Sequence, residues 1–338
     1  MPRPWRRAPA TRRRGTALIG LVTAGVLAGA SPSGARAPSP ASTPAPRVAA
    51  VQARACGIRA RYPQSLAVRS VRILHGPVVV APVCFGRRGP YPFLIDTGAA
   101  RSLVTPALAH RLGLVASGPS GFAAGLKCRA RVVPSAVAAW SLGGAALGPG
   151  TVLVGALPRL PVRIDGIVGS DELSRFGEIA IDYARGRLVL ASSPRAGARG
   201  GTSARLRARE VRLRARLSLV RAGQAVVAEV RVDFAGHAAD LVVDTGAALS
   251  AVSSSLARRA SLAAAPGDLV LAAFGCPVRV AQVRSGRWSL GGVVLSRRTL
   301  AVLPAGGIDA AGLLGADVLS SAGTAIVDYA GGRLLLER

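Results

Sequence analysis

The sequence predicts an all-β protein built from two homologous lobes, with a few short helices. Three observations support this fold class. A series of motifs recurs in one order along the 338-residue chain. The segments around these motifs are rich in valine and broken by glycine, as is typical of strands and tight turns. The length is sufficient for two domains, and the 50% content of hydrophobic residues excludes a disordered chain.

The internal repeat is carried by landmarks that match at offsets of 148 or 146 residues. Because they keep one order and differ by a single two-residue gap, they indicate a duplicated unit. The landmarks are Leu94-Ile95-Asp96-Thr97-Gly98-Ala99-Ala100 with Val242-Val243-Asp244-Thr245-Gly246-Ala247-Ala248, Cys128 with Cys276, Trp140-Ser141-Leu142-Gly143-Gly144 with Trp288-Ser289-Leu290-Gly291-Gly292, Gly166-Ile167-Val168-Gly169 with Gly312-Leu313-Leu314-Gly315, and Asp182-Tyr183 with Asp328-Tyr329.

The N-terminal segment is predicted to be an export signal followed by a linker. Residues 1–30 combine an arginine-rich start with a weakly apolar run that is shorter than the ~20 residues needed to span a bilayer. Ala28 and Ala30 offer a small-residue cleavage motif before Ser31. Residues 31–65 are a Pro-, Ala- and Ser-rich linker and N-terminal extension. We expect a secreted or extracytoplasmic protein, with membrane anchoring by an uncleaved signal as the alternative.

The two lobes are expected over residues 66–192 and 205–338, joined by a linker over residues 193–204. In each lobe a short helix is expected after Asp-Thr-Gly, over residues 106–112 and 253–260. A second helix is expected after Gly-x-x-Gly, over residues 171–175 and 317–321, with Asp171 and Asp317 as N-terminal caps.

Strands account for the rest of each predicted lobe. The valine-rich segments 78–80 and 226–230 fit buried strands. Hairpins are expected over residues 179–190 and 325–336, where glycines mark the turns. Apolar and basic residues alternate over residues 205–216, which predicts an edge strand with outward charges that deter aggregation.

The paired Asp-Thr-Gly motifs are the strongest indication of chemistry. One such tripeptide is an ordinary turn, whereas two in repeat register can bring two carboxylates together. Carboxylates about 3 Å apart cannot both ionise, so they share a proton and titrate as a pair. One form can then take a proton from water while the other protonates a carbonyl oxygen. This chemistry requires neither a cofactor nor a metal ion.

These motifs resemble the active-site turns of aspartic proteases. From about residue 66 to the C-terminus the chain resembles a bacterial retropepsin-like aspartic protease in which two copies are fused. The resemblance implies two double-psi β-barrel-like lobes that form a pseudo-dimer, with the active site in the inter-lobe cleft. It places the catalytic pair at Asp96 and Asp244. The residues that it assigns to support the active-site turns are Thr97, Gly98, Thr245 and Gly246.

The same resemblance places flaps over residues 118–131 and 267–279. The first contains three glycines, whereas the second is more apolar, and neither has the tyrosine typical of pepsins. Four cysteines allow three pairings. A bridge between Cys128 and Cys276 at the flap tips would leave Cys56 with Cys84 and would obstruct substrate entry. Isolated thiols or other pairings are the interpretation we favour from sequence.

Other functional classes have little support in the sequence. The three histidines are scattered and no cysteine pair has zinc-site spacing, so no metal site is expected. There is no G-x-S-x-G signature of a serine hydrolase. Trp140 and Trp288 are expected to be core anchors. Four further carboxylates are expected to have structural roles in turns and hairpins, namely Asp165, Asp309, Asp182 and Asp328.

The net charge of +28 is almost wholly due to arginine. Few aromatic residues interleave the arginines and no nucleic-acid module is recognisable, so we expect no specific nucleic-acid partner. Non-specific attraction to anionic cell-envelope surfaces is expected instead.

The function predicted from sequence is that of an exported aspartic endopeptidase. We expect a monomer, as an internal pseudo-dimer, with a polypeptide substrate. The alternative is a non-catalytic cell-envelope binding protein that retains the duplicated fold.

Overall fold

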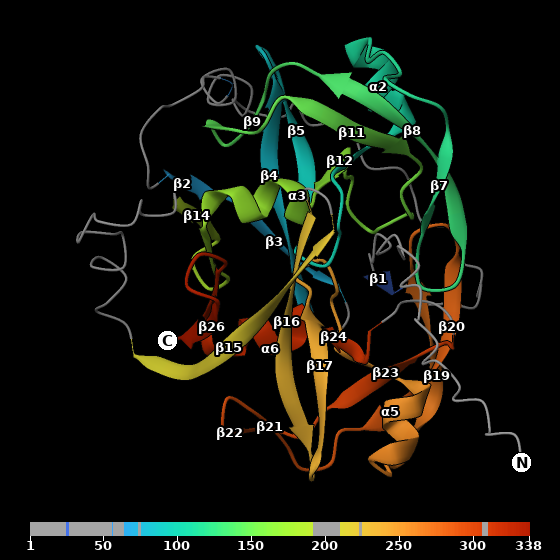
Figure 1. Cartoon of the computed structure of the whole chain (residues 1–338), viewed down its shortest axis with the longest axis vertical. Coiled ribbons are helices and arrows are strands. Elements are labelled where there is room, and N and C mark those ends of the chain that lie inside the picture. The colour runs from blue at the N-terminus through green and yellow to red at the C-terminus, as the bar shows by residue number, and fades with distance from the viewer. Residues whose placement is uncertain are drawn as a thin grey trace, which may run out of the picture.

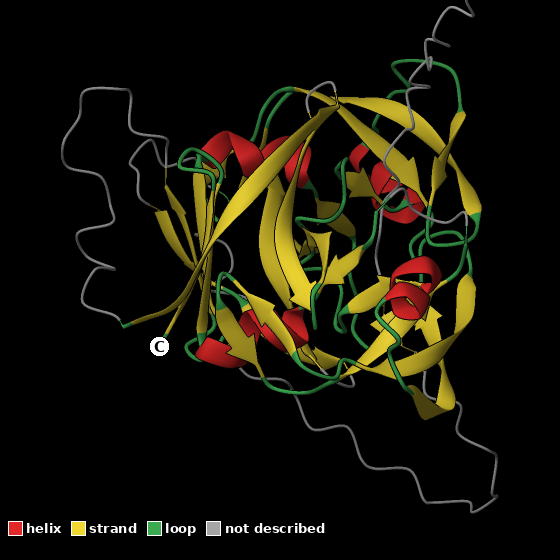
Figure 2. Ribbon diagram, turned by 60° about the horizontal axis from the view of Figure 1, so that its bottom comes forward, coloured by secondary structure: helices red, strands yellow, loops and turns green. Residues whose placement is uncertain are grey.

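A computed structural model describes residues 25–26, 56, 64–73, 76–191, 210–222, 225–305 and 310–338. Most of the predicted signal peptide and of the N-terminal extension lies outside the described residues. The linker over residues 193–204, together with His75 and Asp309, also lies outside them. Figure 2 shows that strands make up most of the molecule and that its helices are short.

In the first half of the described chain the strands are β3 (Arg69–Ile73), β4 (Gly76–Phe85), β5 (Arg88–Ile95), β6 (Leu103–Val104), β7 (Gly121–Ala124), β8 (Arg129–Val137), β9 (Trp140–Leu142), β10 (Ala145–Ala146), β11 (Gly150–Gly155) and β12 (Gly166–Val168). They form a ten-stranded sheet in the order β10-β9-β4-β5-β12-β6-β11-β8-β7, with β3 paired to β4. Most neighbours are antiparallel, but β12 runs parallel to β5 and β11 parallel to β6.

In the second half the described strands are β15 (Val211–Ala222), β16 (Ala225–Phe234), β17 (His237–Val243), β18 (Ala251–Ser253), β19 (Ala264–Ala272), β20 (Pro277–Arg284), β21 (Trp288–Leu290), β22 (Val293–Leu295), β23 (Thr299–Leu303) and β24 (Gly312–Leu314). The parallel pairs recur here, as β24 with β17 and β23 with β18. The repeated motifs therefore fold into the same local topology in both lobes. A two-residue strand, β1 (Gly25–Val26), pairs with the free side of β19.

The two predicted C-terminal hairpins join the lobes. They consist of β13 (Glu178–Asp182) with β14 (Arg187–Ala191), and of β25 (Thr324–Asp328) with β26 (Arg333–Glu337). β13 pairs antiparallel with β25, so that Ala180 lies opposite Ile326. With β2 (Gln64–Ala67) next to β14 and the first part of β15 next to β26, the hairpins form one continuous sheet that joins the lobes, at the left of Figure 1.

The start of β15 confirms the edge-strand prediction within the described residues. From Val211 to Arg216 it pairs with β26, and from Leu217 onward it pairs with β16. Leu213, Ala215 and Leu217 are buried, whereas the arginines between them are exposed. The alternation thus directs the positive charges to solvent, as expected for a strand that ends a sheet.

The short helices lie where the sequence predicts them, but one capping prediction is wrong. After the Asp-Thr-Gly turns come α2 (Pro106–Leu112) and α5 (Ser254–Arg259), and after Gly-x-x-Gly come α3 (Ser170–Leu173) and α6 (Ala316–Leu319). The N-cap residues of α3 and α6 are glycines, not aspartates. Asp171 and Asp317 lie one position inside their helices' starts and bind other groups. None of the helices in the described part of the chain combines the length and apolar character needed to cross a bilayer.

Trp140 and Trp288 occupy equivalent places in the hydrophobic core. Both are buried, and their indole Nε1 groups donate to Gly148 O and Ser296 O at 2.8 Å. Phe85 stacks on Trp140, and Phe234 stacks on Trp288 in the same way. The predicted anchoring role is confirmed, because each tryptophan joins its strand to a nearby turn through one hydrogen bond and one ring contact.

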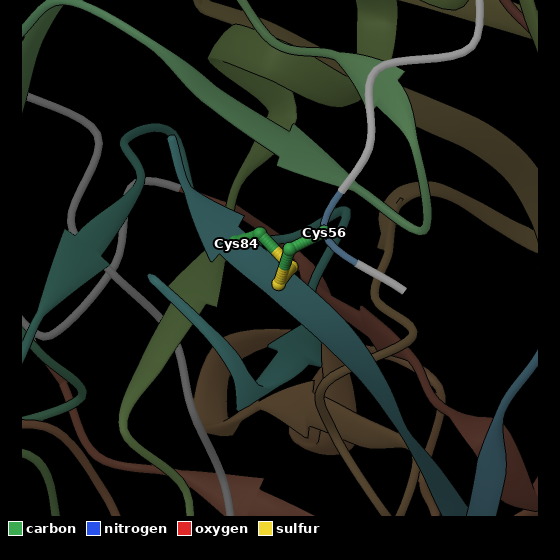
Figure 3. Close-up of a disulfide and its surroundings, with 2 residues drawn as sticks. All are labelled: Cys56 and Cys84. Atoms are coloured by element: carbon green, nitrogen blue, oxygen red, sulfur yellow. A yellow bond between two sulfur atoms is a disulfide. The ribbon is translucent and has the colours of Figure 1, made fainter. Parts of the chain in front are cut away.

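A disulfide between Cys56 and Cys84 fastens the N-terminal extension to β4 (Figure 3). The Cα atoms are 5.4 Å apart, and 28 residues separate the two cysteines in sequence. Cys84 is 1% exposed, so this end of the bridge lies within the core. The bridge therefore attaches Cys56 to the N-terminal lobe.

The glycine pair that follows each tryptophan strand generates a stability prediction. Gly291 and Gly292 both have positive φ, 57° and 81°. A Cβ on Gly291 would lie 2.2 Å from Arg214 O of β15, whereas one on Gly292 meets nothing within 4 Å. Gly292→Ala should therefore cost about 1–2 kcal/mol from conformation alone, and Gly291→Ala should cost at least about 2 kcal/mol more. Urea unfolding of both variants measures this, and equal losses would contradict a close approach to β15.

Candidate active site

Asp96 and Asp244 follow the buried ends of β5 and β17, which run parallel to β12 and β24. The Asp96 N–H donates to Val168 O at 3.1 Å, and the Asp244 N–H donates to Leu314 O at 3.0 Å. These acceptors belong to β12 and β24. The strand of each Gly-x-x-Gly motif therefore lies directly beside the aspartate turn of its lobe.

Close packing at this point requires the glycines that end the two Gly-x-x-Gly motifs. A Cβ on Gly169 would lie 2.7 Å from the carbonyl carbon of Arg101 and 2.8 Å from Ala99 O. A Cβ on Gly315 would lie 2.7 Å from the carbonyl carbon of Leu249. Both approaches are to backbone atoms, which cannot rotate away. Any larger residue would push the second strand away from the aspartate turn.

The two turns are locked together by their threonines. The Thr97 N–H donates to Thr245 Oγ1 and the Thr245 N–H donates to Thr97 Oγ1, each at 3.1 Å. The same hydroxyls donate across the interface, from Thr97 to Val243 O at 2.6 Å and from Thr245 to Ile95 O at 2.8 Å. Each threonine thus accepts from one group of the opposite lobe and donates to another, which fixes the two turns face to face.

The carboxylates face each other across this contact. In each turn the Oδ1 atom accepts two backbone N–H groups, from Gly98 and Ala99 on Asp96 and from the corresponding residues on Asp244, at 2.9–3.0 Å. A Cβ on Gly98 would lie 2.4 Å from Cγ of Asp244, and a Cβ on Gly246 would lie 2.4 Å from Cγ of Asp96. Only glycine therefore lets each carboxylate pack onto the opposite turn.

The electrostatics of the pair follow from this enclosure. Neither Asp96 nor Asp244 exposes any surface, at 0% each. Burial, and then the charge of Asp244, raise the pKa of Asp96 well above its ordinary value. Burial raises the pKa of Asp244 to about 7 against the lowering effect of its turn amides and of a hydrogen bond with Asp96. The pair is thus able to hold one proton over a wide range of pH.

A second pair of buried carboxylates supports the aspartate turns, and sequence reasoning missed its role. Asp171 accepts from the Ser102 N–H and hydroxyl at 2.9 and 2.7 Å, and the hydroxyl accepts from the Gly169 N–H at 3.0 Å. Ser250, Asp317 and Gly315 repeat this arrangement at 2.6–2.9 Å. The sequence did contain a signal for this role, because a serine follows the Asp-Thr-Gly motif at the same position in both copies.

Two buried tyrosines from the landmarks Asp182-Tyr183 and Asp328-Tyr329 are coupled to the aspartates crosswise. Burial, and then the charge of Asp244, raise the pKa of Tyr183. Burial, and then the charge of Asp96, raise the pKa of Tyr329 in the same way. Both phenols are therefore neutral wherever the carboxyl pair can hold its proton. The tyrosines follow β13 and β25, so the inter-lobe sheet lies near the carboxyl pair.

The predicted flaps are hairpins whose tips meet on one side of the molecule, as β7–β8 and β19–β20 in Figure 1. A disulfide joins Cys128 to Cys276, with Cα atoms 5.8 Å apart. The described residues contain no free cysteine. The interpretation favoured from sequence, isolated thiols or other pairings, is therefore wrong. The two equivalent flap positions come close enough because the lobes are related by an approximate two-fold axis that passes between them.

The other residues singled out in the sequence lie away from the carboxyl pair. Asp165 binds Arg163 at 3.1 Å, and Asp182 and Asp328 accept backbone N–H groups within their hairpin turns. His110 and His237 are exposed. No group of three metal-ligating side chains occurs within the described residues.

Comparison with known proteins agrees with this geometry. The sequence model of the aspartyl protease family matches residues 80–171 and 201–318, more than half of the chain. The chain belongs to the aspartyl protease family. The two matched segments contain the two aspartate turns, one in each lobe, and the retropepsin-like all-β fold class predicted from sequence is confirmed.

The chain is similar to solved structures that include two plant seed proteins and one bacterial protein. Basic 7S globulin from soybean matches with a TM-score of 0.40 and 13% identity, and conglutin gamma from lupine seeds with 0.46 and 12%. Each match covers 81% of this chain and 94% of the other. A retropepsin-like aspartic protease from Rickettsia conorii matches at 0.27 and 20% identity, over 38% of this chain and 90% of that one. No curated protein matches the sequence.

The threonine lock of this aspartyl protease fold generates a stability prediction. Thr97→Val keeps the shape of the side chain but leaves the Thr245 N–H and Val243 O without a partner in a buried site. We expect a loss of about 2–4 kcal/mol in the free energy of unfolding. Thr97→Ser keeps the hydroxyl and should lose about 1 kcal/mol or less. Guanidinium unfolding of the two variants compares them, and equal stability would show that the hydrogen bonds contribute nothing.

The raised carboxyl pKa values predict a pH-dependent stability. Because the folded-state pKa of Asp244 is about 7 against 3.8 for an unperturbed carboxyl, the folded form binds a proton that the unfolded chain has lost. The contribution of Asp244 to the free energy of unfolding is therefore fully present below about pH 4 and is lost as the pH rises through 7. Asp244→Asn removes this loss, so the variant should gain about 4 kcal/mol over the wild type between pH 4 and 8.

Thermal and urea unfolding at several pH values measure this difference. Other buried carboxyls, such as Asp171 and Asp317, are common to both proteins and cancel in the comparison. Asp240→Asn, at a partly exposed carboxyl paired with Arg231, is the control and should follow the wild type. A wild type and an Asp244→Asn variant with the same pH dependence would contradict the raised pKa.

Proposed function

We propose that the protein is an endopeptidase that hydrolyses peptide bonds with a water molecule activated by Asp96 and Asp244. The observation that carries this proposal is the state of the two carboxylates. Each Oδ1 is held by two turn amides, while each Oδ2 is buried and has no hydrogen-bond partner outside the carboxyl pair among the described residues. Two such oxygens on facing carboxylates, with raised pKa values, are suited to hold and move one proton.

The reaction needs only these groups and water. With one proton on the pair, the ionised carboxylate accepts a proton from water as its oxygen attacks the peptide carbonyl carbon. The protonated carboxyl donates its proton to the carbonyl oxygen, which produces a tetrahedral diol. The protonated carboxyl then donates its proton to the nitrogen while the ionised carboxylate accepts a proton from a diol hydroxyl, so that the C–N bond breaks and an acid and an amine are released. The pair ends with one proton, as it began.

The threonines and turn glycines have positioning roles in this proposal. The crossed hydrogen bonds of Thr97 and Thr245 keep the two carboxyl groups facing each other. Gly98 and Gly246 allow each carboxyl group to lie against the opposite turn. Because proton transfer depends steeply on donor–acceptor distance, small errors in this geometry would reduce the rate strongly.

An extended peptide is the expected substrate. The free side of β19 in the second flap already accepts an extended segment, because Val26 lies opposite Leu271 and Gly25 opposite Ala272 in antiparallel pairing. Such strand addition uses backbone hydrogen bonds for affinity and leaves specificity to side-chain pockets. We therefore propose a polypeptide substrate bound in strand-like form between the flaps and the carboxyl pair.

We also propose that the protein is exported as a monomer, with lobes over residues 66–192 and 205–338. Two disulfides suit an oxidising, extracytoplasmic compartment. The predicted signal over residues 1–30 would deliver it there. Attraction to anionic envelope surfaces remains part of this proposal, on the basis of the net charge of +28.

The mechanism predicts that either aspartate is indispensable. Asp96→Asn and Asp244→Asn should each reduce peptide cleavage by at least about 10³-fold, since the pair can no longer both accept and donate. Asp240→Asn is the matched control and should keep full activity. Activity of the wild type should be highest where the pair holds one proton, and it should fall when the pair gains a second proton or loses its last one. Incubation of the wild type and the three variants with a mixed peptide library across pH, with and without pepstatin, measures these activities.

The alternative function is a non-catalytic binding protein of the cell envelope. One observation favours it, namely that both carboxyl groups are fully enclosed beneath bridged flaps. Full activity in either Asn variant would exclude the proposed mechanism. Absence of cleavage at any pH, in both the oxidised and the reduced protein, would favour the binding function.

A further inference from the structure

The two flap tips cross over, and each inserts an apolar side chain into the opposite lobe. Leu126 of the first flap is 1% exposed and belongs to a cluster formed mainly by the C-terminal lobe, with Val242 and Leu313. Phe274 of the second flap is 0% exposed and belongs to a cluster formed mainly by the N-terminal lobe, with Leu94. Hairpin tips usually lie in solvent, so this burial is a specific feature of the closed flaps.

These inserted side chains close the region above the carboxyl pair. The cluster of Phe274 includes Ala99, which follows the Asp96 turn, and the cluster of Leu126 includes Ala247, which follows the Asp244 turn. The tips also touch each other through the backbone, because a Cβ on Gly125 would lie 2.1 Å from Phe274 O. A peptide can reach the carboxyls only if both tips withdraw from the lobes that they occupy.

The disulfide between the tips opposes this withdrawal. Cys128 and Cys276 each lie two residues beyond the inserted side chain of their own flap. A disulfide keeps two Cα atoms within about 7 Å of each other, whereas each crossed tip must move back toward its own lobe to open the site. The two movements are in opposite directions, so an intact bridge prevents them.

We propose that the Cys128–Cys276 disulfide is a redox latch that keeps the peptide site closed, and that a dithiol reductant opens it. The latch rests on the proposed function, in that it regulates access to the same carboxyl pair. The oxidised protein is then a latent form and the dithiol form is the active one.

The bridge is placed where a reductant can reach it. Cys128 and Cys276 are half-buried, and Lys127 and Gly275 beside them are exposed. Cys276 also lines a mainly apolar cavity of about 310 Å³, together with Leu157. By contrast, Cys84 of the second disulfide is 1% exposed. A reductant should therefore open the flap bridge first.

The reaction balances with a dithiol as the co-reactant. Its thiolate attacks the sulfur of Cys276, which faces the cavity, and the bond to Cys128 breaks. The Cys128 thiolate leaves between Lys127 and Arg129 in the sequence, whose positive charges favour it. The second thiol of the reductant then displaces Cys276. Two electrons and two protons pass to the protein, and the reductant becomes a cyclic disulfide.

The test compares three full-length proteins, each with and without dithiothreitol. They are the wild type, Cys128→Ser with Cys276→Ser, and the matched control Cys56→Ser with Cys84→Ser. Cleavage of a mixed peptide library is measured at acidic pH after the reductant has acted at pH 8. Amide hydrogen exchange of segments 94–102 and 242–250 reports opening independently of cleavage.

The variant without the flap bridge should cleave peptides at least tenfold faster than the oxidised wild type and should not respond to dithiothreitol. Reduction should bring the wild type to the same rate. The control should behave like the wild type. Exchange in both segments should rise at least tenfold when the flap bridge is absent. If the serine variant does not fold, reduced and alkylated wild type provides the same comparison.

The outcomes separate the latch from the proteolytic function. Equal cleavage by oxidised wild type and by the bridge-free variant would overturn the latch while supporting proteolysis. Faster exchange without any cleavage would support the latch and count against proteolysis. Unchanged exchange on loss of the bridge would overturn the latch, whatever the cleavage result.

Discussion

The hydrogen bonds that two threonine hydroxyls make across the contact between the lobes set the geometry on which the rest of the site depends. Each hydroxyl of Thr97 and Thr245 accepts a backbone N–H and donates to a backbone carbonyl of the opposite lobe. These bonds lie in a buried site, where an unpaired backbone group would be costly. The lobes must therefore meet in one register, and the carboxylates that precede the threonines must face each other.

The cost of this arrangement is the burial of two acidic groups side by side. Burial and mutual repulsion favour the neutral form, whereas the turn amides favour the charged form. The result is a pair that keeps a proton instead of a fully ionised site. The buried Ser102–Asp171 and Ser250–Asp317 pairs hold the turns from behind. The stability of the turns thus depends on hydrogen bonds, not on the charge of the catalytic candidates.

The closed flaps control access to the carboxyl pair. Leu126 and Phe274 add apolar burial that a glycine-tipped flap would lack, and this favours the closed state even before the disulfide is considered. The inter-lobe sheet formed by β13 and β25 keeps the lobes from separating as rigid bodies. Access to the carboxyls therefore depends on movement of the flaps themselves.

Local features of the chain could be predicted well from sequence. The repeat placed Asp96 and Asp244 in equivalent turns, and the hairpins, short helices and tryptophan anchors lie where glycine, proline and apolar periodicity indicate. The capping role given to Asp171 and Asp317 was wrong, because a nearby serine in another segment competes for the carboxylate. That partner is 69 residues away from Asp171, and local capping rules do not include such contacts.

The sequence by itself determined the duplicated fold and the residues of the carboxyl pair, since a two-fold repeat of Asp-Thr-Gly carries both. Only the tertiary structure decided which cysteines pair, how deeply the carboxyls are buried and which lobe each flap tip enters. Four cysteines allow three pairings, and the choice depends on distances across the two-fold axis. Those distances arise from the packing of the lobes, so the equivalent repeat positions of Cys128 and Cys276 could suggest their pairing but could not decide it.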